Sequence, residues 1–225
     1  MEPLRFAKGT LESKIQKALT EHMFMREWYC KVLTSNKHQK GLPDLFCTCQ
    51  SFGSRWIEVK RSDKFSFTQN QLDVFTRLSS KNIGVYVLNG PHDYDKLFGQ
   101  ANWHSFLFNS RGITLSDKLP TPRPKQGPEG VIQNEIIKEL TKRDWYVVET
   151  HASEFQSGVP DLYACHKNYG GKWIEVKNPK LYSFTPAQVK TFPLLSANGT
   201  PIFILTDVSE VDKILGPENW FWFLK

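Results

Sequence analysis

Apolar residues recur at helical spacing at the start of each half of the chain. Ile15, Leu19 and Met23 stand four residues apart within residues 12–26, so they share one face of a predicted helix. The second half carries similar spacing after Pro128, and its apolar positions are Ile132, Ile136, Ile137 and Leu140. We therefore expect each half to begin with an amphipathic helix.

Short runs of aromatic and β-branched residues predict strands after each of these helices. In the first half the predicted strands are residues 28–33, 44–49, 55–59 and 83–88. A second helix, residues 68–78, separates the last two strands. In the second half the clearest strands are residues 145–150 and 202–205. The order α-β-β-β-α-β predicts an α/β fold, with a mixed β-sheet flanked by helices.

The two halves repeat each other at a constant offset of 117 residues. The segment Trp56–Lys60 recurs as Trp173–Lys177, and 173 − 56 = 117. The same offset relates Ser66-Phe67-Thr68 to residues 183–185. Residues 12–108 align with residues 129–225 without a gap, and roughly a third of the aligned positions are identical. This predicts two tandem copies of one domain, residues 1–108 and 129–225.

A proline-rich segment, residues 109–128, separates the two copies. Prolines at positions 120, 122, 124 and 128 disfavour a helix and favour an extended linker. Such a linker is long enough to place two domains side by side. We therefore expect a single-chain pseudo-dimer that acts as a monomer, with the two copies taking the place of two subunits.

Composition limits the classes of protein further. The formal charge is 29 − 23 = +6, which permits a polyanionic partner without requiring one. No apolar run approaches the roughly 18 residues that a membrane span needs, and residues 1–10 lack the apolar core of a signal peptide. The cysteines form no C-x-x-C motif, so neither a zinc knuckle nor a disulfide framework is expected. We expect a soluble, cytoplasmic protein.

Acidic residues and a lysine are predicted to meet at the end of two strands. Alternate residues of a strand share a face, so Glu58 and Lys60 point one way while Ile57 and Val59 point to the buried side. Asp44 opens the neighbouring strand, within reach of Glu58. Two carboxylates this close repel each other unless a cation lies between them.

Oxygen ligands of this kind suit Mg²⁺ or Mn²⁺. Such an ion polarises a phosphate and lowers the pKa of a water molecule, so the pattern is typical of metal-assisted phosphodiester hydrolysis. The second copy carries Asp161, Glu175 and Lys177 at the matching positions. The alternative is an Asp–Lys–Glu ion-pair network at a sheet edge without catalytic function.

These residues resemble a known motif. Pro43-Asp44 followed by Glu58-Val59-Lys60 is similar to the motif of the PD-(D/E)xK nuclease superfamily. The surrounding Gly-x-Pro-Asp-Leu, Trp-Ile-Glu-Val-Lys and Ser-Phe-Thr-x-x-Gln resemble its VRR-NUC branch, which is similar to Holliday junction resolvases. Residues 9–15 also resemble the first helix of phage-type endonuclease I. Both copies are covered by the resemblance.

The resemblance implies a role for each matching residue. The implied metal ligands are Asp44, Glu58, Val59 (by its carbonyl) and Glu12 in copy one, and Asp161, Glu175, Val176 and Glu129 in copy two. The implied catalytic residues are Lys60, Gln71, Lys177 and Gln188. The predicted DNA contacts, from nearby basic and hydroxyl side chains, are Lys37, Lys40, Arg61, Lys64, Thr68, Lys180 and Thr185.

Four tryptophans have two interpretations each. Trp56 and Trp173 lie on the same strand face as the glutamates, where they either pack in the core or stack on an unpaired base. Trp103 and Trp220 end each copy, and either contact the other copy or pack within their own.

The hypothesis at this point is a Mg²⁺- or Mn²⁺-dependent DNA endonuclease whose two active sites make paired incisions, with branched DNA as the leading substrate. A sequence-specific double-strand endonuclease of restriction or homing type is the first alternative. A non-catalytic DNA-binding protein that retains the nuclease fold is the second. A compact nuclease of this kind would suit a phage or a mobile element.

Overall fold

The computed structural model describes residues 4–33, 41–63, 65–107, 127–150 and 157–223. The chain divides into two compact units, each built around one four-stranded sheet. The elements of the first unit are α1 (Glu12–Phe24), β1 (Tyr29–Val32), β2 (Leu45–Cys49), β3 (Gly53–Val59), α2 (Gln69–Ser80), β4 (Val85–Leu88), the 3₁₀ helix η1 (Pro91–Phe98) and α3 (Trp103–Leu107). Those of the second are α4 (Pro128–Lys142), β5 (Tyr146–Glu149), β6 (Leu162–His166), β7 (Gly170–Val176), α5 (Pro186–Ala197), β8 (Ile202–Leu205) and the 3₁₀ helices η3 (Val208–Leu215) and η4 (Trp220–Trp222).

Both sheets follow the same plan. In the first, β1 pairs antiparallel with β2 and β2 with β3, while β3 pairs parallel with β4. The second sheet, β5-β6-β7-β8, repeats these directions. Two parallel strands need a crossover, which α2 and α5 supply. The two mixed sheets flanked by helices confirm the predicted α/β class.

The strand registers also repeat. Leu45 lies opposite Ile57 in the first sheet, and Leu162 lies opposite Ile174 in the second, which are the same positions shifted by 117 residues. The register matters for function because it sets which side chains face each other at the strand ends. The predicted domain boundaries and the pseudo-dimer arrangement stay predictions.

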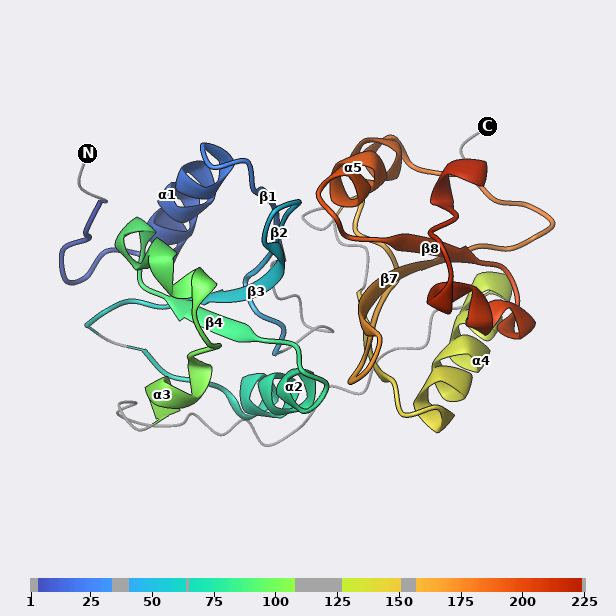
Figure 1. The fold of residues 1–225 in the computed structure, drawn as a ribbon, viewed down its shortest axis with the longest axis horizontal. Helices are drawn as coiled ribbons and strands as arrows, with labels where there is room; N and C mark the ends of the chain where they lie inside the picture. The colour runs from blue at the N-terminus through green and yellow to red at the C-terminus, as the bar shows by residue number, and fades with distance from the viewer. Residues whose placement is uncertain (1–3, 34–40, 64, 108–126, 151–156, 224–225) are drawn as a thin grey trace. The chain divides into compact units, whose positions relative to one another are not determined.

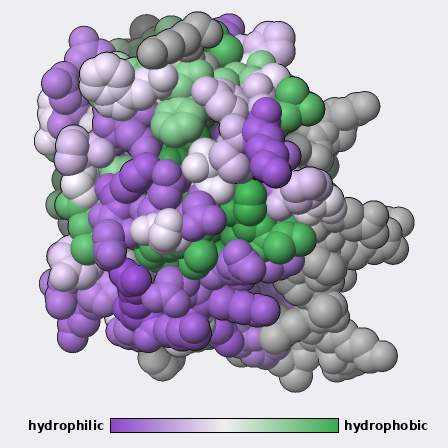
Figure 2. Space-filling model, turned by 90° about the vertical axis from the view of Figure 1, so that its right-hand side faces the viewer, coloured by the Kyte–Doolittle hydropathy of each residue, from purple (hydrophilic) through white to green (hydrophobic). Residues whose placement is uncertain are grey.

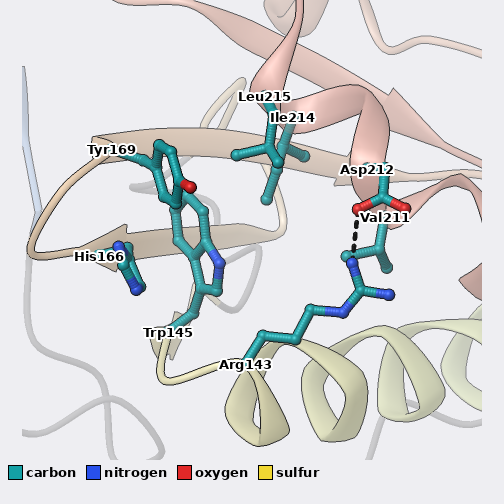
Figure 3. Close-up of a pocket in the computed structure, with 8 residues that line it drawn as sticks. All are labelled: Arg143, Trp145, His166, Tyr169, Val211, Asp212, Ile214 and Leu215. Carbon is teal, nitrogen blue, oxygen red and sulfur yellow. Dashed lines mark hydrogen bonds and ion pairs between the residues drawn. The ribbon is translucent and has the colours of Figure 1, made fainter.

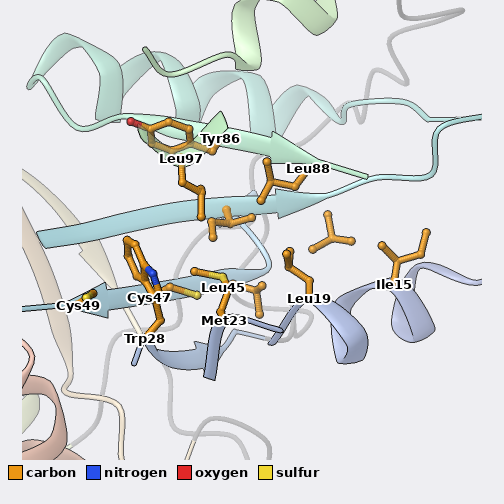
Figure 4. Close-up of a cluster of buried hydrophobic side chains, with 12 residues drawn as sticks. Ile15, Leu19, Met23, Trp28, Leu45, Cys47, Cys49, Tyr86, Leu88 and Leu97 are labelled. Atoms are coloured by element: carbon orange, nitrogen blue, oxygen red, sulfur yellow. The ribbon is translucent and has the colours of Figure 1, made fainter. Parts of the chain in front are cut away.

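One face of the first sheet is covered by α1. Ile15, Leu19 and Met23 are buried and join the apolar side chains of the strands, among them Ile57 and Val59, in one cluster. Figure 4 shows the side chains of α1 pointing towards the strands that they cover. Figure 1 shows α1 and α2 on opposite faces of this sheet, so the sheet is enclosed on both sides.

The second unit is packed in the same way. Ile136 and Leu140 of α4 join Ile174 and Val176 of β7 in a buried cluster, and η3 closes it with Val211. Figure 1 shows α5 on the other face of the sheet. The 3₁₀ helices that close each core were not predicted, because their sequences lack a clear helical or alternating pattern.

The first helix of the second unit corrects one prediction. Pro128 was predicted, with three linker prolines, to disfavour a helix, but it is the first residue of α4. Proline is favoured at the first position of a helix, since the missing N–H needs no partner there and the fixed φ suits the helix. Glu129 consequently lies in the first turn of α4. Residues 108–126 of the linker lie outside the described residues.

A disulfide corrects a second prediction. Cys30 and Cys47 lie directly opposite each other in β1 and β2, and they are bonded. The sequence shows no spacing rule for such a pair, because only the strand register brings the two thiols together. The second unit has Val147 and Ala164 at these positions, which also face each other.

The described parts of the chain contain no helix that is both long and apolar enough to cross a membrane. One face of the molecule, seen in Figure 2, mixes hydrophilic surface with smaller hydrophobic areas. The second unit exposes several large apolar side chains, namely Val131, Tyr169, Leu181, Tyr182, Val189, Leu194, Leu215, Phe221 and Trp222.

Candidate active site

The strand register brings two carboxylates together at one end of the first sheet. Since Leu45 lies opposite Ile57, continuing the antiparallel register by one residue places Asp44 opposite Glu58. Residues opposite each other in a sheet point to the same face. The carboxylates therefore meet on the face that α2 covers. The predicted proximity of the two acidic residues is a direct result of this pairing.

Asp44 is held in place by the neighbouring strand. Its Oδ2 atom accepts a hydrogen bond from the backbone N–H of Val59 at 2.8 Å. The loop before it approaches α2 closely at Gly41, which has a φ of +95°. A Cβ atom at Gly41 would lie 2.3 Å from the carbonyl oxygen of Asn70. Only glycine fits, so Gly41 anchors the loop that presents Asp44.

Lys60 completes an ion pair beside these carboxylates. Its Nζ atom lies 2.6 Å from Oε1 of Glu58, and both side chains are almost fully buried. The ammonium group also lies 5.6 Å from the ring centre of Phe67, within cation–π range. The lysine is therefore fixed between a carboxylate and an aromatic ring at the end of β3.

Gln71 reaches the same oxygen from α2. Its Nε2 atom donates to Oε1 of Glu58 at 2.5 Å, while its Oε1 atom accepts from the backbone N–H of Thr68 at 3.0 Å. The Thr68 hydroxyl in turn accepts from the backbone N–H of Gln71. This is a capping box, which fixes both the start of α2 and the Gln71 side chain. Gln71 thereby orients Glu58.

The electrostatics of the site favour an added cation. Burial, followed by the charge of Asp44, raises the pKa of Glu58 to about 8, although Lys60 opposes the shift. Burial also raises the pKa of Asp44. Burial by itself lowers the pKa of Lys60, but the neighbouring carboxylates, Glu58 foremost, raise it overall. The lysine keeps its proton, while the carboxylates are costly to ionise without a further positive charge.

The second unit repeats this arrangement. Lys177 Nζ lies 2.7 Å from Glu175 Oε1, and Gln188 Nε2 donates to the same oxygen at 2.6 Å. Oδ2 of Asp161 accepts from the backbone N–H of Val176 at 3.0 Å. Thr185 and Gln188 form a capping box at the start of α5.

The first-helix glutamates lie beside both sites. Glu12 is the first residue of α1, and its charge acts on Asp44, Glu58 and Lys60. Glu129 Oε1 accepts from the backbone N–H of Asn178, one residue after Lys177, at 3.3 Å. Both glutamates thus lie near the strand ends, and their predicted role as metal ligands stays a prediction.

One oxygen atom of Glu58 in the first site could bind a metal ion. Within the described ranges, no three His, Cys, Asp or Glu side chains are grouped to hold a metal ion. The expected ligand set was Asp44, Glu58, Glu12 and the Val59 carbonyl, and Glu12 is not grouped with the other two carboxylates as a third ligand. Two carboxylates and the backbone carbonyl of Val59 remain as candidate ligands. Oε2 of Glu58 is buried and has no hydrogen-bond partner. A buried carboxylate oxygen without a partner is costly, and a divalent cation would satisfy it.

The predicted DNA contacts are placed in different ways. Arg61 is paired with Asp63, with its Nη2 atom 2.7 Å from Oδ2. Thr68 and Thr185 cap their helices, while Lys180 is exposed. The remaining candidates, Lys37, Lys40 and Lys64, lie outside the described residues.

Two features of the site were not predicted from the sequence. Phe67 and Phe184 lie beneath the lysines, with Lys177 Nζ 5.0 Å from the centre of the Phe184 ring. The glycines that anchor the aspartate loops, Gly41 and Gly158, were likewise not assigned. The signal was available, since both types of residue are identical in the two halves.

The tryptophans pack within their own units. Trp56 and Trp173 are 1% exposed, and Trp56 meets the ring of Phe46 edge to face, so stacking on a base is excluded for them. Trp103 is buried, and its indole N–H donates to the hydroxyl of Ser79 in the same unit. Trp220 donates to Glu218 two residues away.

Comparison with known proteins adds little to this description. No protein-family model matches the chain, and no curated protein matches it. A solved structure described as a VRR_NUC domain is similar to this chain at 22% sequence identity and a TM-score of 0.34. The match covers 39% of this chain and 92% of that chain. At this level the similarity decides nothing, so the functional argument depends on the side chains themselves.

Proposed function

We propose that this protein is a divalent-metal-dependent endonuclease of the PD-(D/E)xK type, similar to the VRR-NUC branch, that hydrolyses phosphodiester bonds of DNA at two active sites. The observation that carries the proposal is the repetition of one constellation. An aspartate, a glutamate, a lysine and a glutamine meet in both units, with the same partner atoms for glutamate Oε1. Roughly two-thirds of the aligned positions differ, yet these side chains do not.

A purely structural ion-pair network explains this pattern less well. Burying ion pairs is a weak source of stability, because desolvation offsets much of the attraction. Here each lysine is accompanied by two carboxylates, and burial, followed by the charge of Asp44, raises the pKa of Glu58 to about 8. Carboxylates with such perturbed pKa values cluster at functional sites.

The proposed roles follow from the contacts. Asp44, Glu58 and the Val59 carbonyl would hold the metal ion, which, when bound, would polarise the phosphate and lower the pKa of its water. Lys60 keeps its proton, so it is suited to neutralise the negative charge that develops on the phosphate. Gln71 and Phe67 hold Glu58 and Lys60 in position. The corresponding residues of the second unit would act in the same way.

Two sites in one chain support paired incisions. Each site would cut one strand, and branched DNA such as a four-way junction is the proposed substrate. The chain would then act as a monomer, with its two halves taking the place of two subunits.

Strand-resolved cleavage with Mg²⁺ or Mn²⁺ tests the proposal. The wild type, Glu58→Ala, Glu175→Ala and the double variant would be offered a four-way junction, a matched duplex and a single strand. We expect each single variant to confine incision to one strand and the double variant to abolish it. Lys138→Ala, on the exposed face of α4, serves as a matched surface control.

Each other outcome has a defined meaning. Equal cleavage of junction and duplex at equal salt would refute branch selectivity while leaving the nuclease intact. Cleavage at one fixed position of a long plasmid would favour a sequence-specific endonuclease. Metal-independent DNA binding without cleavage of any substrate would favour a binding protein. Cleavage that survives in the double variant would place the chemistry elsewhere.

A further inference from the structure

A cavity of about 290 Å³ opens in the second unit, away from the catalytic residues. It lies between the end of α4, the turn joining β6 to β7, and η3. Its lining consists of Arg143, Trp145, His166, Tyr169, Val211, Asp212, Ile214 and Leu215. His166 ends β6, whereas Asp161 directly precedes that strand, so the cavity and the active site are at opposite ends of the strand.

Aromatic rings form one wall of this cavity. Trp145 and Tyr169 are stacked with ring centres 5.9 Å apart and an interplanar angle of 11°. His166 lies at a tilt against both rings, 5.3 Å from Trp145 and 4.9 Å from Tyr169. Figure 3 shows these three side chains together on one side, with Arg143 and Asp212 on the other.

The first unit fills the corresponding place with its own side chains. Tyr94 and Phe98 stand where the second unit has Val211 and Leu215, since 94 + 117 = 211 and 98 + 117 = 215. The hydroxyl of Tyr94 accepts a hydrogen bond from Nε1 of Trp28 at 3.0 Å. The ring of Phe98 packs against Tyr94 with centres 5.2 Å apart.

The second unit keeps the tryptophan and the arginine of this place and loses these two rings. Trp145 corresponds to Trp28, and Arg143 corresponds to Arg26, which lies over the Tyr94 ring in the first unit. With valine at position 211 in place of tyrosine, the second unit has no phenol at the position from which Tyr94 accepts the indole N–H of Trp28. Figure 3 shows the indole nitrogen on the side of the ring that faces Arg143 and Val211, across the cavity. The cavity therefore lies where the first unit holds aromatic rings, and the indole N–H of Trp145 could donate a hydrogen bond to a planar ring bound there.

We propose that this cavity binds a nucleobase, either of a free nucleoside or of an unpaired nucleotide in DNA. One face of the base would stack on the aromatic wall at Tyr169, whose ring is half-exposed, while the buried Trp145 lies stacked against that ring. Its edge presents both acceptors and donors, which suit the indole N–H of Trp145, the guanidinium of Arg143 and the carboxylate of Asp212. A volume near 290 Å³ is at the lower end for ligand pockets, which fits a single nucleoside.

A tyrosine side chain of a partner protein is the competing occupant. A phenol matches the indole donor, as Tyr94 does in the first unit. It offers no second edge to the Arg143–Asp212 pair, whose atoms Nη1 and Oδ1 lie 2.5 Å apart at the mouth of the cavity. The donor and acceptor groups of Arg143 and Asp212 therefore favour a base over a phenol. The small phenol p-cresol serves as the probe for the tyrosine alternative.

Two binding measurements separate the sources of the base. Calorimetric titration of the full-length protein with adenosine and with thymidine, in EDTA, detects free nucleosides. A duplex with one bulged 2-aminopurine, whose fluorescence is quenched on stacking, detects an unpaired nucleotide. Neither measurement depends on cleavage, so failure of the proposed nuclease function would leave this test unaffected.

Exchanging residues between the units gives matched variants. Val211→Tyr restores the missing ring, and Leu215→Phe, at a half-exposed position, narrows the cavity with less demand on folding. We expect each to weaken base binding by about tenfold or more. Tyr94→Val with Phe98→Leu opens the same place in the first unit, and should add a second site of similar affinity.

The outcomes are decisive in both directions. Binding by the wild type that is lost in Val211→Tyr or Leu215→Phe supports the proposal, whichever of the two sources of base is bound. Equal binding by wild type and both variants would place the base elsewhere and overturn it. No binding of any base, or binding of p-cresol without binding of nucleosides, would also overturn it.

Discussion

The two candidate active sites share their aspartate, glutamate, lysine and glutamine side chains and differ around them. In the first site Oε2 of Glu58 is buried without a partner, whereas in the second Oε2 of Glu175 accepts from the backbone N–H of Asp161 at 3.2 Å. Arg61 is paired with Asp63 near the first site. The second has Asn178 and the exposed Lys180 at those positions. The same four side chains are thus placed in two electrostatic surroundings.

This difference indicates unequal sites rather than one working and one decayed copy. A decayed site would lose a carboxylate, a lysine or a glutamine, and neither site has. What varies is how firmly the glutamate is held and how much positive charge lies nearby. We therefore expect both sites to cut DNA, with different metal requirements and different contributions to DNA affinity.

Loss of a lysine should have the largest effect. Lys60→Met or Lys177→Met removes the positive charge nearest the phosphate, and should slow incision at the affected site by about 10²–10³-fold. Strand-resolved single-turnover cleavage measures each site separately. A loss confined to one of the two variants would show that only one site is catalytic and would end the comparison.

Changing the glycine that anchors the aspartate loop should come next. Gly41→Ala places a Cβ atom against the Asn70 carbonyl at positive φ, and should destabilise the first unit by about 3 kcal/mol. Gly53→Ala is the matched control, since Gly53 also has positive φ but nothing lies within 4 Å of its Cβ position. Urea denaturation compares the two. Equal losses of unfolding free energy in the two variants would mean that the contact of the new Cβ atom with α2 does not destabilise the protein.

The glutamines should distinguish the two sites. Gln71→Leu and Gln188→Leu remove the donor that orients each glutamate, and should raise the Mg²⁺ concentration for half-maximal cleavage by about 10-fold or more. We expect the larger rise at the first site, because Glu175 keeps its bond from the Asp161 N–H. An unchanged metal requirement with a lower maximal rate would instead assign the glutamines to the substrate.

Stability without metal should depend on pH through Glu58. Its pKa is about 8 in the folded protein against an ordinary 4.5, because burial and then Asp44 disfavour the charged form. The folded state therefore binds this proton more tightly than the unfolded state does. The corresponding stability is present in full below pH 4.5 and is lost as the pH rises through 8.

Glu58→Gln removes this titration. In EDTA, the melting temperature of the wild type should fall by a few degrees more than that of Glu58→Gln between pH 6 and pH 9. The slope is the quantity compared, since the substitution also shifts stability at every pH through the loss of the Lys60 pair. Parallel curves would contradict the assigned protonation. Addition of Mg²⁺ should reduce the fall in the wild type alone.

The smallest effect is expected from the surrounding charges. Asp63→Asn releases Arg61, and Lys180→Ala removes an exposed charge from the second unit. The first should raise and the second should lower DNA affinity several-fold, and each should change the salt dependence of binding by about one phosphate contact. Fluorescence anisotropy in EDTA over a range of salt measures both. If neither substitution changed DNA affinity, DNA would not bind near Arg61 or Lys180.

Much of the fold was accessible from the sequence. The helical spacing of Ile15, Leu19 and Met23 predicted α1 within two residues at its end, and residues 202–205 were predicted as the strand that is observed. The prediction that Pro128 disfavours a helix was wrong, because proline was considered only as a helix breaker and not as a favourable first residue of a helix. Patterns that depend on local spacing were predicted well, whereas η1 and η3 depend on packing against the finished core.

The candidate site was predictable for a different reason. Repetition at an offset of 117 residues singled out the aspartates, glutamates, lysines and glutamines without any structure. The role of Gln71 was less accessible, because its contact with Glu58 depends on how α2 lies across the sheet. The pairing of Cys30 with Cys47 needed the strand register, which single residues do not reveal.

The sequence by itself determined the repeat, the order of elements and the residues at both candidate sites, because these follow from spacing along the chain. Only the tertiary structure decided which groups meet across strands and between helices. In the tertiary structure Asp44 lies opposite Glu58, and Oε2 of Glu58 has no hydrogen-bond partner. Tyr94 fills a place in the first unit, whereas the smaller Val211 leaves a cavity at the corresponding place in the second. Contacts between segments far apart in the chain depend on register and side-chain volume, which become fixed only when the layers pack.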